Sequence, residues 1–98
     1  ANEIFEICER LGIDYDKVTE YATYDERLGK SHWSVPGPDG HYGFGGSCFP
    51  KDINALISVA KNKLDLYPNT LIGAWETNLE VRPEEDWREL KGRAVVDE

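Results

Sequence analysis

The sequence predicts an all-α domain, and three observations support that prediction. Apolar residues recur at helical spacing over residues 1–26 and 51–90, whereas glycine and proline crowd residues 29–50. No period-two run of strand length occurs before residue 93. The expected order is therefore helices, a long Gly/Pro-rich loop, and helices again.

The first predicted helix starts at the N-terminus and ends before Gly12, which stands where a C′ glycine terminates a helix. Its apolar stripe is expected to lie in the core and consists of Ile4, Ile7, Cys8 and Leu11. Asp14 is the expected N-cap of a second helix, which should continue toward Gly29. The buried side of that second helix is predicted to hold Val18, Tyr21 and Ala22.

The third predicted helix has Pro50 in its first turn, and its apolar face consists of Ile53, Leu56, Ile57, Ala60 and Leu64. A fourth helix should begin at about Thr70 and end before Pro83, with Trp75 in the core or in a dimer interface. The acidic run over residues 84–86 is interpreted as the charge pattern of a helix N-terminus, starting a last helical piece that ends by Gly92. We therefore predict a domain over residues 1–83 and a tail, or the start of a linker, over residues 84–98.

Composition limits the classes of function. The chain has 98 residues and a formal net charge of −8, so it holds one small domain and lacks the basic face that nucleic acid requires. No apolar run reaches the roughly 18 residues of a membrane span, and the N-terminus of the sequence lacks the basic, then apolar, pattern of a signal peptide. These features predict a cytoplasmic protein that binds neither membrane nor nucleic acid.

The cysteines are predicted to be free thiols rather than a disulfide or a metal site. Cys8 falls in the apolar stripe of the first helix, and no other secretory mark accompanies the two cysteines. Cys48, His32 and His41 show no C-x-x-C or H-x-x-x-H spacing. We expect no metal.

The Gly/Pro-rich loop carries the chemistry. Five of the nine glycines lie within residues 37–46, and Gly45-Gly46 allows a ligand to approach the backbone closely. Cys48 then stands at the start of the third helix, where free N–H groups and the helix dipole stabilise a thiolate. Lys51 adds a cation, and Asp52 follows on the same helical face, where a carboxylate can activate water. The same pattern also describes plain helix capping, so both interpretations stand on the residues alone.

The ten residues 43–52, Gly-Phe-Gly-Gly-Ser-Cys-Phe-Pro-Lys-Asp, resemble the active-site signature of the UDP-glucose/GDP-mannose dehydrogenase family. Residues 2–4, 8–9 and 12–14 are similar to the start of that family's central domain. Asp25-Glu26-Arg27-Leu28-Gly29 resembles its D-x-R-I-G segment, and residues 36–40 resemble a long version of the loop before the cysteine. The resemblance covers almost the whole chain, and it implies a helical domain like the C-terminal domain of 6-phosphogluconate dehydrogenase.

The resemblance implies an NAD-dependent oxidation of UDP-glucose to UDP-glucuronate, carried out by a homodimer that meets through the helical domain. By position, Cys48 would be the nucleophile, Asp52 would assist the hydrolytic water, and Lys51 would lie beside the site and the cofactor. Arg27 would reach the sugar nucleotide of the partner subunit, although pairing with Asp25 or Glu26 explains it equally from the residues alone. The loop along the sugar nucleotide would be Phe44, Gly45 and Gly46.

The chain also departs from the family. It contains no G-x-G-x-x-G, and the family's nicotinamide-binding and C-terminal nucleotide-binding domains have no counterpart in it, so we expect NAD to be bound mainly by an N-terminal domain outside this chain. The isolated chain is then predicted to be inactive.

Three alternatives stay open: a non-catalytic dimerisation module, a GDP-mannose or UDP-N-acetylhexosamine dehydrogenase domain, and an unrelated cysteine hydrolase. Phe49 favours the glucose branch over the mannose branch. Residues 27–51 carry three basic side chains and one acidic one, so the loop region is locally positive and suits a sugar diphosphate.

Overall fold

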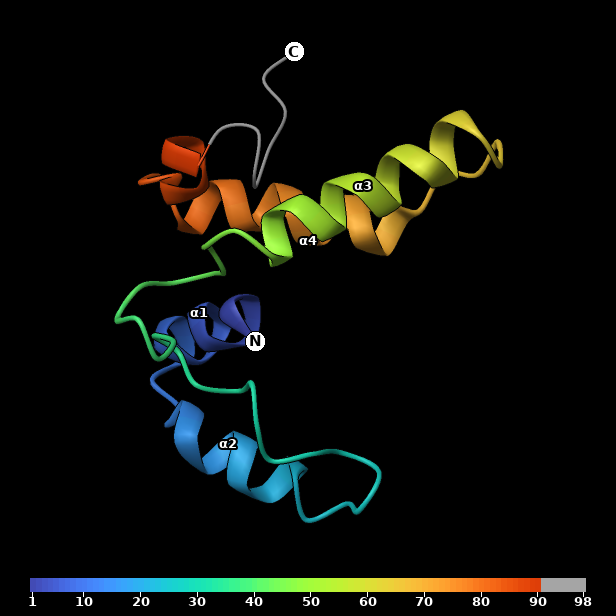
Figure 1. Ribbon diagram of the computed structural model, residues 1–98. Coiled ribbons are helices and arrows are strands. Elements are labelled where there is room, and N and C mark those ends of the chain that lie inside the picture. Colours follow the sequence, from blue (N-terminus) through green and yellow to red (C-terminus); the bar gives the residue numbers. More distant parts are fainter. Residues whose placement is uncertain (91–98) are drawn as a thin grey trace. The chain divides into compact units, whose positions relative to one another are not determined.

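The computed structural model describes residues 1–90. In that range it contains four α-helices, a short 3-10 helix and no strand, so the predicted all-α class is confirmed (Figure 1). The chain divides into two compact units, Ala1–Tyr42 and Gly43–Glu98. Each unit is described by itself below.

The first unit holds α1 (Asn2–Leu11) and α2 (Tyr15–Ala22). Gly12 ends α1 with φ 67°, and the Asp14 carboxylate accepts a 2.9 Å hydrogen bond from the N–H of Asp16, so both predicted caps are confirmed. The expected extension of α2 toward Gly29 is wrong. The helix stops at Ala22, because beyond it the N–H groups of Tyr24 and Asp25 bond carbonyls three residues back instead of four and the chain enters turns.

The core of the first unit is small and largely aromatic. Cys8 and Tyr15 are buried, and the Phe5 and Tyr15 rings meet edge to face with centroids 5.5 Å apart. The Tyr15 hydroxyl donates to the Trp33 carbonyl, which ties the loop to α2, and burial raises the pKa of this phenol above its usual range. The buried position predicted for Cys8 is confirmed.

The predicted apolar faces of the first unit are covered only in part. Ile7 and Leu11 are 56% and 66% exposed, so α1 buries Cys8 and leaves much of its stripe in contact with solvent. Tyr21 is 61% exposed and Ala22 is exposed as well, so the predicted buried side of α2 is wrong at both positions. Two short helices and one loop cover a single side of each helix, and the other side is left open.

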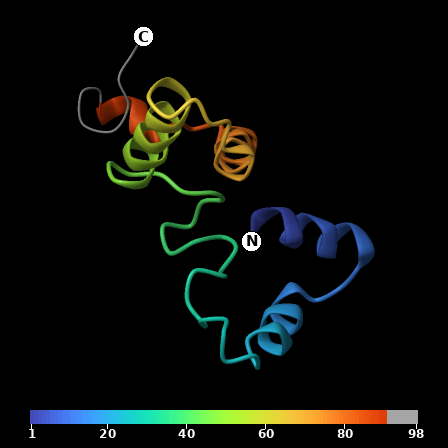
Figure 2. The same cartoon turned by 90° about the vertical axis from the view of Figure 1, so that its right-hand side faces the viewer.

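The second unit holds α3 (Phe49–Asn62), α4 (Asn69–Val81) and the 3-10 helix η1 (Asp86–Leu90). The α3 and α4 helices lie side by side in both views (Figures 1 and 2). Pro50 lies in the first turn of α3, as predicted. The expected apolar face of α3 is buried at Ala60 and half-buried at Ile53 and Ile57, but Leu56 and Leu64 are exposed, because α4 covers only one side of α3.

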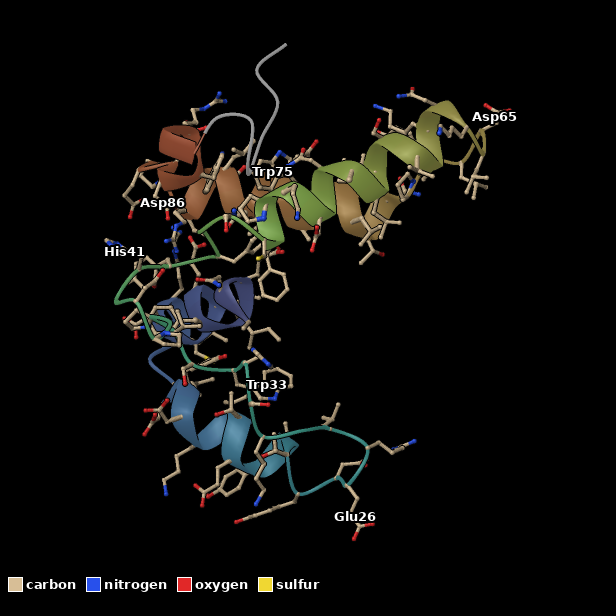
Figure 3. The ribbon with its side chains drawn as sticks, viewed as in Figure 1. Glu26, Trp33, His41, Asp65, Trp75 and Asp86 are labelled. Carbon is tan, nitrogen blue, oxygen red and sulfur yellow. The ribbon has the colours of Figure 1, made fainter. Side chains whose placement is uncertain are left out.

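An aromatic cluster joins α4 to η1 in the second unit. The Trp75 ring lies 5.1 Å from that of Trp87 and 6.1 Å from that of Phe44, measured between centroids. Trp87 is fully buried. Trp75 is half-buried and its ring packs against rings of its own unit (Figure 3), while the dimer-interface alternative stays a prediction.

The predicted division at residue 83 stays a prediction. Asp86 and Trp87, from the expected tail, contact the helices and the loop of the second unit. The helix end predicted at Gly92, like the rest of residues 91–98, lies outside the described part of the chain. Among residues 1–90, no helix is both long and apolar enough to cross a membrane.

Candidate functional site

The glycine loop, defined here as residues 43–46, leads directly into the first turn of α3. Gly43 and Gly46 have φ of 66° and 77°, values that residues other than glycine rarely adopt. Gly45, by contrast, does not have a positive φ. Gly45 is required for a different reason, which is close packing.

Asn78 of α4 is hydrogen-bonded to the loop at Phe44. Its side-chain oxygen accepts from the Phe44 N–H at 2.7 Å, and its amide nitrogen donates to the Phe44 carbonyl at 2.9 Å. Asn78 is only 1% exposed. One buried side chain therefore satisfies both backbone groups of Phe44, as the burial of an irregular segment requires.

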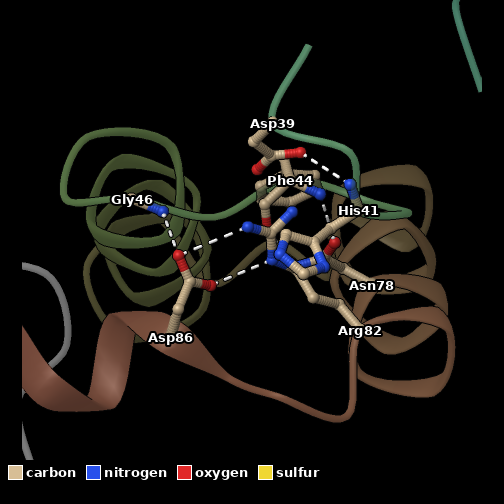
Figure 4. A network of polar contacts seen from close by, with 7 residues as sticks. All are labelled: Asp39, His41, Phe44, Gly46, Asn78, Arg82 and Asp86. Atoms are coloured by element: carbon tan, nitrogen blue, oxygen red, sulfur yellow. Dashed lines mark hydrogen bonds and ion pairs between the residues drawn. The ribbon is translucent and has the colours of Figure 1, made fainter. Parts of the chain in front are cut away.

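Asp86 holds the next part of the loop. Its carboxylate accepts a 3.1 Å hydrogen bond from the Gly46 N–H and two hydrogen bonds from the Arg82 guanidinium, at 2.9 and 3.3 Å (Figure 4). The Arg82 side chain is 3% exposed and that of Asp86 is 39% exposed. The Arg82 hydrogen bonds hold the pKa of Asp86 below its usual range, and the Gly46 N–H acts in the same direction against partial burial.

Gly45 lies directly against this ion pair. A Cβ built on Gly45 would stand 2.5 Å from an Arg82 guanidinium nitrogen and would also overlap the Asp86 carboxylate. A glycine is therefore the residue that lets the loop backbone approach the pair. Gly43 meets Asn78 in the same way.

Cys48 occupies the N-cap position of α3 and is exposed, as a residue that reacts with a bound ligand must be. Its carbonyl accepts the first helical hydrogen bond, from the Asp52 N–H at 2.8 Å. The Ser47 hydroxyl lies 3.9 Å from the Cys48 sulfur. Both cysteines are free thiols, and only Cys48 is accessible.

Lys51 and Asp52 project from the first turn of α3 and pair with each other. The Lys51 amine lies 3.5 Å from the Asp52 carboxylate, and the two side chains are 54% and 66% exposed. The structure links Asp52 to Cys48 through the backbone rather than through a side-chain contact. The predicted cation and carboxylate thus stand in the same helical turn as the thiol, open to solvent.

Arg27 belongs to the first unit and is held locally. Its guanidinium donates to both carboxylate oxygens of Asp25, the shortest hydrogen bond being 2.7 Å, and its side chain is 89% exposed. Because water screens a pair this exposed, the bond to Asp25 holds the Arg27 guanidinium only weakly. The pairing with Asp25 that the sequence left open is therefore present.

The residues that sequence reasoning missed are Asn78, Arg82 and Asp86. A signal was present in α4, where Leu71, Trp75, Asn78 and Arg82 share one face at helical spacing. Polar residues on a face that is otherwise apolar indicate buried hydrogen bonding. Asp86 does begin η1, but its carboxylate binds Arg82 and Gly46 instead of serving only as helix-terminal charge.

Residues 1–90 contain no group of three or more His, Cys, Asp or Glu side chains that could hold a metal ion. The glycine loop with Cys48, Lys51 and Asp52 lies in the second unit, and Arg27 lies in the first.

The chain matches one protein-family model and the sequences of several related proteins. The model of the UDP-glucose/GDP-mannose dehydrogenase family central domain matches residues 1–79. The UDP-glucose 6-dehydrogenase TuaD of Bacillus subtilis is 45% identical over 78 residues, which are 79% of this chain and 15% of TuaD. YwqF of the same organism, also a UDP-glucose 6-dehydrogenase, is 46% identical over 61 residues, 62% of this chain and 13% of its own.

A more distant relative extends the match toward the C-terminus. The UDP-glucose 6-dehydrogenase of Rhizobium meliloti is 34% identical over 95 residues, which cover 97% of this chain and 19% of the relative. The chain thus spans less than a fifth of the length of each of these relatives. No solved structure matches the chain.

Proposed function

The chain belongs to the UDP-glucose/GDP-mannose dehydrogenase family, whose central domain it matches over residues 1–79, and from this premise we propose that it supplies the catalytic thiol of a UDP-glucose 6-dehydrogenase. Cys48 is the proposed nucleophile. The observation that carries the proposal is the exposed Cys48 at the N-cap of α3, directly after a glycine loop whose backbone is fixed by buried side chains.

The proposed role of Cys48 is addition to an aldehyde at C6 of the sugar. A bond would form between sulfur and carbon while the aldehyde oxygen takes up the thiol proton, giving a thiohemiacetal. Transfer of a hydride from that carbon to NAD bound outside this chain, with loss of the hydroxyl proton, would leave a thioester. Water would then attack the thioester, releasing the carboxylate product and the thiol. Asp52, in the same helical turn, is proposed to orient that water, and Lys51 to balance negative charge beside it.

The glycine loop and Arg27 are proposed to bind the sugar nucleotide. Phe44, Gly45 and Gly46 present backbone to a ligand, because no side chain projects from two of the three positions. Arg27 is 89% exposed and is held only by Asp25, so its guanidinium can turn toward a diphosphate. We propose that it does so toward the nucleotide of a partner subunit.

NAD does not fit the residues described here. No strand occurs in residues 1–90, and the sequence holds no G-x-G-x-x-G turn that could receive a pyrophosphate at a helix N-terminus. Lys51 alone is proposed to lie near the cofactor. We therefore propose that NAD is bound mainly outside this chain and that the isolated chain does not oxidise UDP-glucose.

The proposal is tested by grafting. In the chimera, residues 1–90 of this chain replace the equivalent stretch of TuaD, and the rest of TuaD on both sides is kept. NADH formation from UDP-glucose is then measured. The chimera is expected to be active, and Cys48→Ala should lower its kcat by about 10³-fold or more, because no other group can hold the intermediate. The matched control is Cys8→Ala, which removes the buried cysteine and should leave kcat within about twofold.

A folded chimera that stays inactive with Cys48 intact would contradict the proposal, as would equal effects of the two cysteine substitutions. Assays of the same chimera with GDP-mannose and with UDP-N-acetylhexosamines decide among the substrate classes. Activity of the isolated chain with UDP-glucose would contradict its proposed dependence on other domains.

A second role, as a dimerisation module, is favoured by an exposed apolar face on α3. Leu56 and Val59 are 55% and 40% exposed. An apolar helix face of this kind suits a two-fold contact with a second copy. Sedimentation at high micromolar concentration should give a dimer that Leu56→Glu dissociates and the exposed-site control Ser58→Glu does not; a monomeric parent chain would rule this role out.

A further inference from the structure

We propose that Asn78, Arg82 and Asp86 are positioning residues that fix the glycine loop ahead of Cys48. Asn78 bonds both backbone groups of Phe44, and Asp86 accepts from the Gly46 N–H, so the two side chains hold the backbone on either side of Gly45. Arg82 acts through Asp86, to which its guanidinium donates. The proposal deepens the proposed function and rests on it for the consequence in sugar-nucleotide binding. The fixing of the loop itself is a statement about this chain alone.

The Asn78 amide is matched to Phe44 in a way that few side chains allow. It offers one acceptor and one donor at the spacing of a backbone N–H and C=O, and both hydrogen bonds are short, at 2.7 and 2.9 Å. A carboxylate would repel the Phe44 carbonyl, and an aliphatic side chain would leave both groups unsatisfied. Burial of Asn78 to 1% exposure keeps water from replacing it.

Asp86 completes the hold from a different element. Its position is set by Arg82, which is itself buried at the C-terminal end of α4 and donates to both carboxylate oxygens. The Gly46 N–H donates to the Asp86 Oδ2, the same oxygen that accepts the longer of the two Arg82 hydrogen bonds. Gly45 seals the arrangement, because any side chain there would displace the ion pair.

Two features separate this arrangement from ordinary core packing. The bonded groups are backbone groups of the very residues proposed to lie along the sugar nucleotide, Phe44 and Gly46. Asp86 bonds the loop at Gly46 and Arg82 lies against Gly45, although both residues follow residue 79, where the match to the family model ends. The loop conformation is thus set by α4 and η1 before any ligand arrives, which lowers the entropy lost on binding.

The test measures amide hydrogen exchange on the full 98-residue chain. Asn78→Leu should speed exchange of the Phe44 amide by about tenfold or more, while the Ile57 amide in α3 changes less than about twofold. Asn62→Leu, which alters an exposed asparagine on α3, is the matched control and should leave both amides unchanged. Asp86→Ala should speed exchange of the Gly46 amide, and Asp86→Asn, which keeps an acceptor, should do so less.

Equal acceleration of the Phe44 and Ile57 amides would overturn the proposal, because it would mean general destabilisation of the unit. Unchanged exchange at Phe44 and Gly46 would overturn it as well. In the TuaD chimera, Asn78→Leu should raise KM for UDP-glucose by about tenfold with a smaller change in kcat. If Asn78→Leu speeds exchange of the Phe44 amide as expected but the TuaD chimera with Asn78 intact is inactive, the proposed function is contradicted and the positioning role remains supported.

Discussion

Arg27 of the first unit and the glycine loop of the second are both candidate ligand-binding elements, but they are held over different distances along the sequence. Arg27 is bound by Asp25, two residues away, and both side chains reach solvent. The loop is bound by Asn78 and Asp86, which follow Phe44 and Gly46 by 34 and 40 residues and come from α4 and η1. One contact is local and screened, and the others depend on the tertiary structure.

The difference indicates which element is formed before a ligand arrives. The exposed pair of Arg27 with Asp25 lowers the pKa of that carboxyl and raises that of the guanidinium, but it leaves the arginine free to exchange partners. The glycine loop cannot exchange partners without exposing buried polar groups. Under the proposed function, a preformed loop beside the thiol and an adaptable arginine would therefore contact different parts of the sugar nucleotide.

The largest effect is expected for Gly45→Ala, which tests the rigid side of the comparison. The new methyl group would overlap the Arg82 guanidinium and the Asp86 carboxylate, so the free energy of unfolding of the second unit should fall by about 1–3 kcal/mol. Chemical denaturation followed by tryptophan fluorescence measures it. In a Trp33→Phe background, Trp75 and Trp87 report the second unit.

Gly73→Ala is the matched control for this prediction. Gly73 lies inside α4, and a Cβ there meets nothing within 4 Å. The substitution should raise the free energy of unfolding by about 0.5–1 kcal/mol, since alanine is the better helix former. If both substitutions destabilise alike, the loop is not packed as closely as the comparison requires.

A smaller effect is expected from protonation of Asp86. Its pKa lies below the usual value of about 3.9 because of Arg82 foremost, so it stabilises the folded state above about pH 4 and loses that contribution as pH falls through its own lower pKa. The Gly46 amide reports this titration directly by NMR, since its N–H is bonded to the carboxylate. The midpoint should lie below 3.9, which is the ordinary aspartate value.

Arg82→Met tests whether Arg82 is the cause of the lowered pKa of Asp86. Without the guanidinium, partial burial remains and the midpoint at the Gly46 amide should move up. A midpoint at the ordinary value in both proteins would show that Asp86 is not held by Arg82. The contact of Asp86 with the glycine loop would then be as weak as the exposed pair of Arg27 with Asp25 in the first unit.

The sequence predicted what depends on neighbours within a turn. Gly12 and Asp14 cap their helices, and Pro50 lies in the first turn of α3, because capping and proline geometry act over one to four residues. The placement of Cys48 at a helix start follows from the same local rules. Cys8 is buried, as predicted for a core thiol, and Cys48 is exposed, while its role as the nucleophile stays a prediction.

What the sequence could not predict depends on contacts across the fold. Helical spacing identified the apolar stripe of α1 but not what covers it, and Leu11 is exposed. Nothing in the order of residues indicates that Asn78 faces Phe44 or that Asp86 faces Gly46, since loop contacts of this kind have no period. The end of α2 was missed because no glycine or proline stands between Ala22 and Gly29, while the backbone changes to three-residue turn bonds directly after Thr23.

The smallest effect tests the adaptable side of the comparison. Asp25→Asn removes the partner of Arg27, yet exchange of the α2 amides should stay within about twofold of the parent chain, because exposed pairs contribute little. In the TuaD chimera, Arg27→Ala should raise KM for UDP-glucose by about tenfold, since a charged donor to the diphosphate is lost, whereas Asp25→Asn should not. Loss of α2 protection in Asp25→Asn would mean that the arginine is held structurally, and the contrast with the glycine loop would fail.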